Sequence, residues 1–326
     1  MHGILKDVMV SIGMGLILPG IMLNFAVALL EENGNVPVAA VEEIIQETTL
    51  PPQVQLSMLL RQTDGSIRQM DMDTYLEGVV LAEMPASFEE EALKAQAVVA
   101  RTYTQKAYTT GGKHGDGSIC TEPSCCQAYI DPSEYLARGG TQKNLEKIQN
   151  AVRSTSGYVL TYDGMLIEAT YFSCSGGSTE DAVAVWGTDF PYLRSVSSPG
   201  EEGAAYYTDT VTFTKQQLEA ALNVTLTGNS GGWFSDIVYT SGGGVDSVTV
   251  GGQTFGGTKL RSLLGLRSTA FTVVPREEAV SITTRGYGHR VGMSQYGADA
   301  MAVSGSTYPQ ILSHYYQGAV LQYLDN

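Results

Sequence analysis

The sequence is poor in cysteine, tryptophan and positive charge. It has four cysteines and two tryptophans in 326 residues, and its 19 lysines and arginines are outnumbered by 34 acidic side chains. The net charge of −15 argues against a nucleic-acid-binding surface, because such surfaces are basic. A chain of this length can form its core without disulfides. Glycine is abundant, with 37 residues, which favours turns and strands over a helical bundle.

One uncharged apolar run lies near the amino terminus. Residues 8–30 carry no charge and are long enough to cross a bilayer once. Lys6 precedes the run and two glutamates follow it, so the positive-inside bias predicts a cytoplasmic segment 1–7 and places the rest of the chain outside the cytoplasm. A cleaved signal peptide, with Ala26-Val27-Ala28 as its cleavage site, is the alternative. Residues 31–55 are acidic, contain three prolines and are predicted to be a linker.

Two helical patterns meet at Pro85. Leu76, Val79 and Val80 mark one helix face, and the next position of that apolar stripe is Glu83, where a helix ordinarily places leucine. Pro85 disfavours helical geometry just before it, so the helix should end beside this carboxylate. Burial and the negative end of the helix dipole would both raise the pKa of Glu83 and suit it to general-acid catalysis. A glutamate turned into solvent at a frayed helix end would show the same pattern.

The helix after Pro85 is rich in alanine and valine. Ser87 and Glu90 predict a capping box at its start, and its small side chains predict a central helix that neighbours approach closely. Lys94 and Arg101 share one face of this helix because they are seven residues apart. That face is either a polar wall of a cleft or the solvent side of the helix.

The rest of the chain alternates helical and strand patterns, which predicts an α+β fold. A catalytic lobe is expected over residues 56–195 and 276–326, with a β-rich lobe inserted over residues 196–275. A hairpin is predicted around Asp163-Gly164, where strand-like runs flank a turn dipeptide. Further helices are expected over residues 145–155, 214–222 and 307–318, and from about residue 294.

A cysteine-rich loop over residues 114–126 contains His114, Cys120, Cys125 and Cys126. One imidazole and three thiols are the ligand types of a tetrahedral zinc site. The competing interpretation is a disulfide from Cys120 to Cys125 or Cys126. If all four residues bind zinc, no position is open for water and the site is structural. If Cys125 stays out, a water could take the fourth position, as in a zinc-dependent hydrolase.

A glycine-rich loop precedes the helix predicted to open near residue 294. Gln295 and Tyr296 then lie in its first turn, beside unpaired backbone N–H groups that readily bind ligand oxygens. His289 in the loop is a candidate for contacting substrate or steadying Glu83, or it is an ordinary structural histidine. Cys174 paired with His289 would be a thiol nucleophile, whereas a lone strand cysteine is more often inert packing.

Four blocks of the sequence occur together in one order. They are GVVLAEMPASFEEEALKAQAVVARTYT, YFSCSGGSTE, LRSLLGLRSTAF and GYGHRVGMSQYGADAMA. This set resembles the stage II sporulation protein D (SpoIID) family, peptidoglycan lytic transglycosylases related to the amidase enhancers. The resemblance implies two lobes that flank a cleft with Glu83 on its floor. It also implies that Tyr171, Ser173 and Ser175 line that cleft and that LRSLLGLRS is a structural element. Because some clostridial members bind zinc in the cysteine loop, it favours zinc over a disulfide.

The resemblance also implies an activity. Such an enzyme cleaves the β-1,4 bond between N-acetylmuramic acid (MurNAc) and N-acetylglucosamine (GlcNAc) in peptide-free peptidoglycan strands, leaving 1,6-anhydroMurNAc ends. Glu83 would be the acid and base, and the chemistry needs no cofactor. The implied setting is septal wall remodelling and engulfment during sporulation, anchored in the mother-cell membrane at the forespore septum. The implied partners are a sporulation amidase (SpoIIP) and the membrane protein SpoIIM. The alternatives are a non-catalytic glycan-binding amidase enhancer and a zinc-dependent hydrolase.

Overall fold

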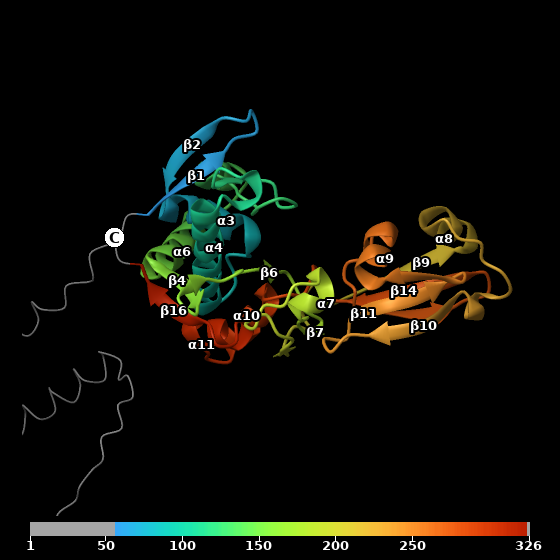
Figure 1. The fold of residues 1–326 in the computed structure, drawn as a ribbon. Helices are drawn as coiled ribbons and strands as arrows, with labels where there is room; N and C mark the ends of the chain where they lie inside the picture. Colours follow the sequence, from blue (N-terminus) through green and yellow to red (C-terminus); the bar gives the residue numbers. More distant parts are fainter. Residues whose placement is uncertain (1–55, 325–326) are drawn as a thin grey trace, which may run out of the picture. The chain divides into compact units, whose positions relative to one another are not determined.

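The computed structural model describes residues 56–324. The predicted cytoplasmic segment, transmembrane anchor and linker of residues 1–55 lie outside that range. Within residues 56–324, no helix is both long and apolar enough to cross a membrane. This part of the chain mixes helices with small sheets (Figure 1), so the α+β prediction is confirmed. Its buried side chains form two hydrophobic clusters.

The first cluster is built around α4 (Glu90–Thr110). Helices α3 (Met72–Glu83), α6 (Gln142–Ser154), α10 (Gln295–Val303) and α11 (Tyr308–Tyr315) all contact it (Figure 1). The alanines and valines of α4 are buried on most sides, and their small size lets these helices approach its backbone. The prediction of a central packed helix is therefore confirmed.

The start of α4 differs from the prediction. Ser87 and Glu90 do not form the predicted capping box. The helix begins at Glu90, so its N-cap is Glu89, and the Glu89 side chain makes no cap hydrogen bond. The backbone N–H of Glu89 instead donates to Asp299 Oδ1 of α10 at 2.7 Å. A tertiary partner thus satisfies a backbone donor at the start of this helix.

Helix α3 ends where the sequence predicts. Its last residue is Glu83, and Met84 is already extended, with φ −123° and ψ 140°, as the following Pro85 favours. The N-cap is Asp71, whose side chain accepts from the Thr74 backbone N–H. The Glu83 carboxylate therefore lies at the carboxyl-terminal end of α3.

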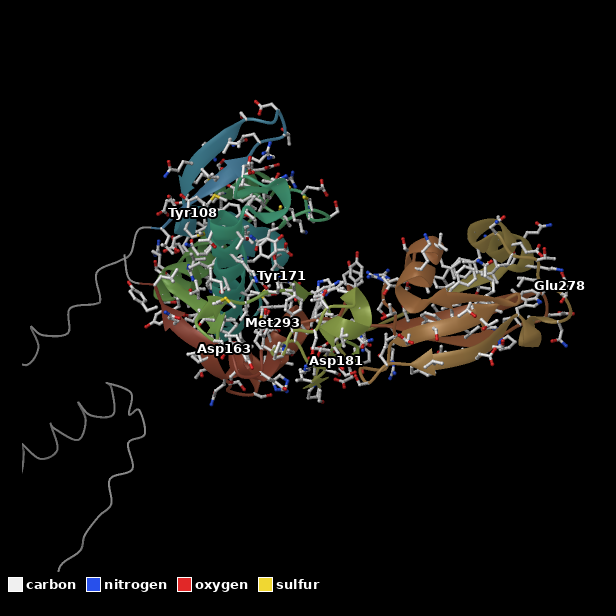
Figure 2. The ribbon with its side chains drawn as sticks, in the orientation of Figure 1. Tyr108, Asp163, Tyr171, Asp181, Glu278 and Met293 are labelled. Atoms are coloured by element: carbon white, nitrogen blue, oxygen red, sulfur yellow. The ribbon has the colours of Figure 1, made fainter. Side chains whose placement is uncertain are left out.

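Short sheets complete the first cluster. A parallel pairing places Tyr171 beside Met293 and Phe172 beside Ser294, so two segments far apart in the sequence lie together (Figure 2). The strands are β1 (Ser57–Arg61), β2 (Ile67–Asp71) and β3 (Ser118–Cys120) in one sheet, β4 (Tyr158–Tyr162), β5 (Met165–Leu166) and β16 (Val320–Tyr323) in another, and β6 (Tyr171–Phe172) with β15 (Met293–Ser294). The turn between β4 and β5 is the predicted hairpin at Asp163-Gly164.

The second cluster is β-rich and extends from Phe213 to Ile282. It overlaps the expected insert of residues 196–275, but Val280 and Ile282 also belong to it, whereas Val196 packs in the first cluster. Its sheets are β9 (Thr208–Thr214), β14 (Ala279–Arg285) and β13 (Phe271–Pro275), and β10 (Phe234–Tyr239), β11 (Val245–Val250) and β12 (Gln253–Gly256), with helices α8 (Lys215–Leu222) and α9 (Gly257–Leu264). Short elements between them are η1 (Gly112–His114), α5 (Pro132–Ala137), β7 (Gly177–Ser178), α7 (Ala182–Trp186), β8 (Ser197–Ser198) and η2 (Ser230–Gly232).

A buried ion pair joins the two clusters. Arg290 Nη1 lies 3.1 Å from Glu180 Oε1, and both side chains are at most 2% exposed. Arg290 Nη2 also donates to the Gly242 carbonyl at 2.8 Å, and the Gly244 N–H donates to Glu180 Oε1 at 2.7 Å. The turn between β10 and β11 is therefore attached to the segment that carries His289.

Candidate functional site

Glu83 lies in a pocket of about 370 Å³ at the end of α3. Its Oε1 accepts the Ala128 N–H at 2.8 Å and the Tyr171 hydroxyl at 3.0 Å, and the Gln295 side chain hydrogen-bonds the same carboxyl group. Burial raises the pKa of Glu83, and these three hydrogen bonds reduce that effect without reversing it. The carboxyl group is thus held in place and is not a frayed end.

Tyr171 is the side chain that faces Glu83 from β6. Side chains alternate along this strand, so Ser173 lines the same pocket while Phe172 is buried against His289. Burial raises the pKa of Tyr171 well above its usual value, and the neighbouring Glu83 raises it further. The hydroxyl therefore keeps its proton and can serve as a donor.

Gln127 is a site residue that the sequence interpretation missed. Its Oε1 lies 3.2 Å from the Tyr171 hydroxyl, and its Nε2 donates to Thr104 Oγ1 at 2.9 Å and to the Tyr75 hydroxyl at 3.3 Å. The signal in the sequence was its position directly after Cys125-Cys126. The cysteine loop thus leads straight into Gln127 and then Ala128, which donates to Glu83.

The opposite side of the pocket comes from the start of α10. Ser294 caps this helix by accepting the Gly297 N–H, and Gln295 and Tyr296 occupy its first turn as predicted. The Tyr296 N–H donates to the Ser173 carbonyl at 3.0 Å, which connects this turn to the end of β6. The pocket is lined by Leu81, Ala82, Glu83, Met84, Pro85, Phe88, Ser173, Tyr206, Gln295 and Tyr296. Of these, Glu83, Ser173, Gln295 and Tyr296 had been predicted as site residues, whereas the other lining residues, including Phe88 and Tyr206, had not.

His289 lies next to the site without lining the Glu83 pocket. Its ring packs between Phe172 and Trp186, with centroids at 5.6 and 5.3 Å, and its Nδ1 accepts the Val291 N–H at 3.1 Å. It also hydrogen-bonds the backbone of Tyr171. Burial, reinforced by Arg261, lowers the pKa of His289 to about 4, so the ring is neutral at pH 7. This placement suits a role in holding the Tyr171 strand.

Cys174 does not pair with His289. Its thiol donates to Glu201 Oε2 at 3.0 Å, and burial raises its pKa to about 12. A thiol that stays protonated is a poor nucleophile. The interpretation of Cys174 as a nucleophile is therefore wrong.

Three residues predicted to bind substrate lie elsewhere. The Arg101 side chain is 0% exposed and pairs with Asp73 at 3.0 Å, so substrate cannot reach it. Ser175 is also buried and donates to Glu201 Oε1 at 2.8 Å. Lys94 pairs with two glutamates of its own helix, both at 2.9 Å. None of the three lines the Glu83 pocket. For Arg101 the reason is that its side of α4 turns into the core.

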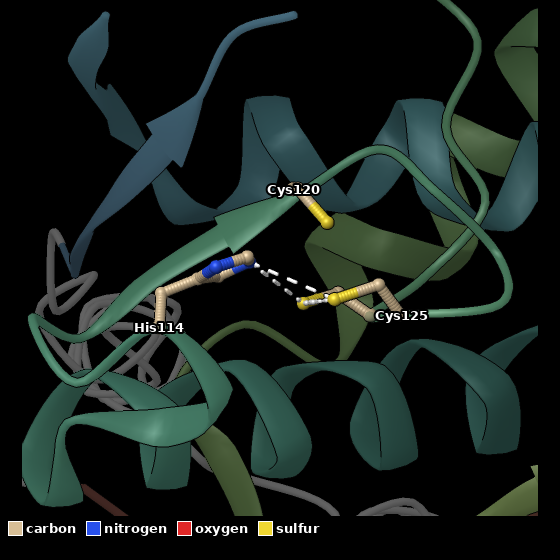
Figure 3. Close-up of side chains that lie close together, drawn as sticks. His114, Cys120 and Cys125 are labelled. Carbon is tan, nitrogen blue, oxygen red and sulfur yellow. Dashed lines mark hydrogen bonds between the residues drawn. The ribbon is translucent and has the colours of Figure 1, made fainter. Parts of the chain in front are cut away.

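The four predicted metal ligands do converge. One potential ligand atom from each of His114, Cys120, Cys125 and Cys126 lies within 4.8 Å of the others (Figure 3). Cys126 Sγ lies 3.6 Å from His114 Nε2 and 3.8 Å from Cys125 Sγ, and all four cysteines are free, so the alternative disulfide does not form. With zinc–sulfur bonds of about 2.3 Å, tetrahedral ligand atoms lie roughly 3.6–3.8 Å apart. These residues therefore fit a closed tetrahedral zinc site.

The ligands come from both ends of one short segment. His114 follows α4 in η1, Cys120 ends β3, and Cys125 and Cys126 lie in a turn whose N–H groups donate to the Glu122 carbonyl. Although burial opposes it, hydrogen bonds from the Glu122 backbone and His114 lower the pKa of Cys120 to about 7. Burial raises the pKa of Cys126 to about 12.

Comparisons with known proteins cover most of the chain. A family model described as "Stage II sporulation protein" (SpoIID) matches residues 61–162, which include Glu83 and the cysteine loop. The chain is 39% identical over 270 residues to stage II sporulation protein D of Bacillus subtilis, covering 81% of this chain and 78% of that protein. It is 38% identical over 271 residues to the same protein of Bacillus amyloliquefaciens, covering 82% and 78%. The amidase enhancer of Bacillus subtilis is 31% identical over 304 residues, covering 76% and 40%.

Proposed function

The chain belongs to the stage II sporulation protein D family, which is related to the amidase enhancer, and we propose that it is a lytic transglycosylase. Its substrate would be peptide-free peptidoglycan, cut at the MurNAc-β-1,4-GlcNAc bond to leave 1,6-anhydroMurNAc ends. The setting would be wall remodelling at the septum and engulfment during sporulation.

The observation that carries this proposal is that, of the residues within 56–324 that line its pocket, Glu83 is the one carboxylate. Glycoside hydrolases usually need two carboxylates, one as acid and one as nucleophile or base. A lytic transglycosylase needs one, because a hydroxyl of the substrate replaces both water and an enzyme nucleophile. The raised pKa of Glu83 favours the protonated form that the first step requires.

The hydrogen bonds indicate which oxygen acts. Oε1 of Glu83 accepts from both Ala128 and Tyr171, so the acid proton belongs on Oε2. In the first step Oε2 gives this proton to the bridging oxygen, the bond from MurNAc C1 to that oxygen breaks, and GlcNAc leaves with a free hydroxyl. The Ala128 and Tyr171 donors then stabilise the carboxylate that has formed.

The second step returns the proton. The C6 hydroxyl of MurNAc attacks C1, and its proton passes to the Glu83 carboxylate as the C1–O6 bond closes the anhydro ring. Glu83 is then again the neutral acid, and no water has entered the product. One residue thus serves as acid and then as base, as microscopic reversibility allows.

We propose that zinc bound by His114, Cys120, Cys125 and Cys126 is structural. When bound, it would supply a rigid cross-link between η1 and the turn at Cys125, with no open position for water. The residues that follow the zinc ligands connect the loop to the Glu83 site. Gln127 and Ala128 follow the last ligand directly, and they hydrogen-bond to Tyr171 and Glu83.

The test is mass spectrometry of peptide-free glycan strands after incubation with the full-length protein. Wild type should yield anhydro-ended products, and Glu83→Gln should reduce their rate at least about 100-fold. Glu146→Gln, at an exposed position of α6, is the matched control and should cleave like wild type. Reducing ends from wild type would indicate a hydrolase. No product from wild type would overturn the proposal in favour of a binding module.

A second candidate function is a non-catalytic glycan-binding module that stimulates an amidase. The observation in its favour is the 31% identity to the amidase enhancer over 76% of this chain. An intact Glu83 does not distinguish the two functions, whereas anhydro-ended products from the purified protein do.

We propose the partners and location from family membership. The partners are peptidoglycan glycan strands, the sporulation amidase SpoIIP and the membrane protein SpoIIM. Residues 8–30 would anchor the protein in the mother-cell membrane, with the catalytic domain outside the cytoplasm. We would purify the full-length protein and a variant that lacks residues 1–30 from sporulating cells and compare what co-purifies. This comparison tests both the partners and the membrane location.

A further inference from the structure

A second and larger pocket shares a residue with the Glu83 pocket. It has a volume of about 630 Å³, and Tyr206 lines both pockets. Tyr206 and Tyr287 leave 39% and 41% of their surface exposed. The lining residues are Tyr206, Thr258, Arg261, Ser262, Gly265, Leu266, Arg267 and Tyr287. This pocket therefore lies next to the proposed reaction centre and combines open aromatic rings with two arginines.

Arg267 is fixed by its surroundings. Its guanidinium carbon lies 4.7 Å from the centre of the Tyr206 ring and 5.5 Å from that of Tyr287, and Nε donates to Asp209 Oδ2 at 2.9 Å. The two rings contact each other edge to face at 5.1 Å. Within residues 56–324, no hydrogen bond engages the two terminal nitrogens of this guanidinium, since the bond to Asp209 is made by Nε. Those nitrogens are therefore available to a ligand.

Arg261 on α9 has no acidic partner within residues 56–324. Its Nε donates to the Leu266 carbonyl at 3.2 Å, and its guanidinium group is half-buried. A partly buried cation without a carboxylate is costly unless a ligand neutralises it. Two arginines line this pocket, and one of them has no acidic partner within residues 56–324, which favours an anionic ligand; carboxylates match the guanidinium fork.

We propose that this pocket is a distal subsite for a MurNAc residue, whose free lactyl carboxylate pairs with Arg261 and Arg267. The sugar ring would lie against Tyr206 and Tyr287, because aromatic rings cover the apolar faces of sugars. This inference rests on the proposed function only in that it takes the same glycan as ligand. In peptide-free glycan, the lactyl carboxylate is the anion that recurs at every MurNAc. A stem peptide converts it into a neutral amide and adds bulk, so the pocket selects strands without peptides.

The experiment measures binding calorimetrically with the full-length protein in a Glu83→Gln background, so that no glycan is consumed. The probes are peptide-free glycan fragments and the same fragments with their carboxyl groups amidated. The native fragments should bind about tenfold more tightly, as expected for loss of a charged hydrogen bond. Arg261→Gln should remove this preference while binding amidated fragments unchanged. Lys259→Gln removes one charge from the same helix outside the pocket and should retain the full preference.

Arg267→Lys is the second variant, since it retains the charge that faces Asp209 but loses the planar fork. It should reduce the preference in part. Equal binding of native and amidated fragments by the protein with both arginines intact would overturn the proposal. So would an equal loss for both probes in Arg261→Gln, which indicates a structural role.

Cleavage assays separate this proposal from the proposed function. If the protein with Glu83 intact forms no anhydro ends but the preference for free carboxylates is present, the subsite is correct and the lytic function is not. If anhydro ends form and amidated fragments bind as tightly as native ones, the lytic function is correct and the subsite is not.

Discussion

The hydroxyl of Tyr171 lies 3.0 Å from Oε1 of Glu83, and the same hydroxyl lies 3.2 Å from Oε1 of Gln127. A phenol has one proton, so it can donate fully to only one of these two acceptors at a time. A carboxylate is the stronger acceptor, whereas a neutral carboxyl group competes less well with an amide. The Tyr171 proton can therefore follow the charge on Glu83 without any movement of heavy atoms.

Removing this hydroxyl should shift the pH dependence of cleavage. Tyr171→Phe loses one of the hydrogen bonds that lower the pKa of Glu83, so that pKa should rise further. Because the reaction needs protonated Glu83, activity falls as pH rises through this pKa, and the falling limb of the profile should move to higher pH. The maximal rate should fall about tenfold, since the carboxylate formed in the first step loses a donor.

The measurement is the rate of anhydro-end formation between pH 4 and 9. Tyr129→Phe is the matched control, because Tyr129 stacks on Tyr75 and makes no hydrogen bond to Glu83. An unchanged falling limb in Tyr171→Phe would contradict the role of this hydroxyl.

Glu83→Gln should stabilise the protein at neutral pH while it abolishes cleavage. The pKa of Glu83 is higher in the folded protein than in the unfolded chain, because burial disfavours the carboxylate. Its contribution to stability is therefore full below the unfolded pKa and is lost as pH rises through the folded pKa. A glutamine does not titrate and avoids this loss.

Urea unfolding at pH 4 and pH 8 measures the effect. The free energy of unfolding of Glu83→Gln should exceed that of wild type at pH 8, and the difference should shrink towards pH 4. A variant that is less stable at both pH values would indicate that the carboxylate itself holds α3 in place.

Local patterns predicted much of the site. Glu83 on the apolar stripe of α3, the break at Pro85, and Gln295 and Tyr296 at the start of α10 all followed from helix periodicity and capping. Contacts between distant segments could not be predicted in this way. Asp299 accepts the Glu89 N–H at the start of α4, although the two residues are 210 positions apart.

The spacing of Lys94 and Arg101 shows the limit of periodicity most clearly. Helical spacing tells which side chains share a face but not whether that face points into the core or towards a ligand. Gln127 and Tyr206 were missed for a related reason, since neither lies in a periodic segment and each reaches the site through tertiary packing.

Arg101 should be important for stability rather than for substrate binding. Its buried guanidinium pairs with Asp73 at 3.0 Å and donates to the Val152 carbonyl at 3.2 Å and the Tyr158 carbonyl at 3.3 Å. Arg101→Met leaves these acceptors unpaired and should lower the free energy of unfolding by about 3 kcal/mol. Lys94→Met removes only surface ion pairs and should cost about 0.5 kcal/mol or less.

The KM of Arg101→Met for glycan, measured at a temperature at which the variant stays folded, tests whether Arg101 contacts the substrate. It should equal that of wild type within about twofold, because stability effects and binding effects are independent when the residue does not touch the ligand. A KM raised more than tenfold with unchanged stability would restore Arg101 to the substrate site.

Removing the metal should weaken both the loop and the position of Glu83. We expect one zinc per chain in wild type and none in His114→Ala, with a lower Tm in the variant, because a structural zinc contributes directly to folding stability. Cys174→Ala alters a cysteine outside the cluster and should keep the full zinc content. Metal analysis and thermal unfolding give these results without any activity assay.

The effect on the site follows from the chain path. Cys126 is followed at once by Gln127 and Ala128, and the Ala128 N–H is 2.8 Å from Glu83 Oε1. If the zinc site fixes this path, the Ala128 amide should exchange its hydrogen faster in His114→Ala, and kcat should fall while glycan affinity stays within about twofold. A variant that loses zinc and Tm but keeps wild-type exchange at Ala128 would show that the loop is stabilised independently of Glu83. The exchange rate at this one amide therefore decides whether the metal loop and the catalytic carboxyl group are coupled.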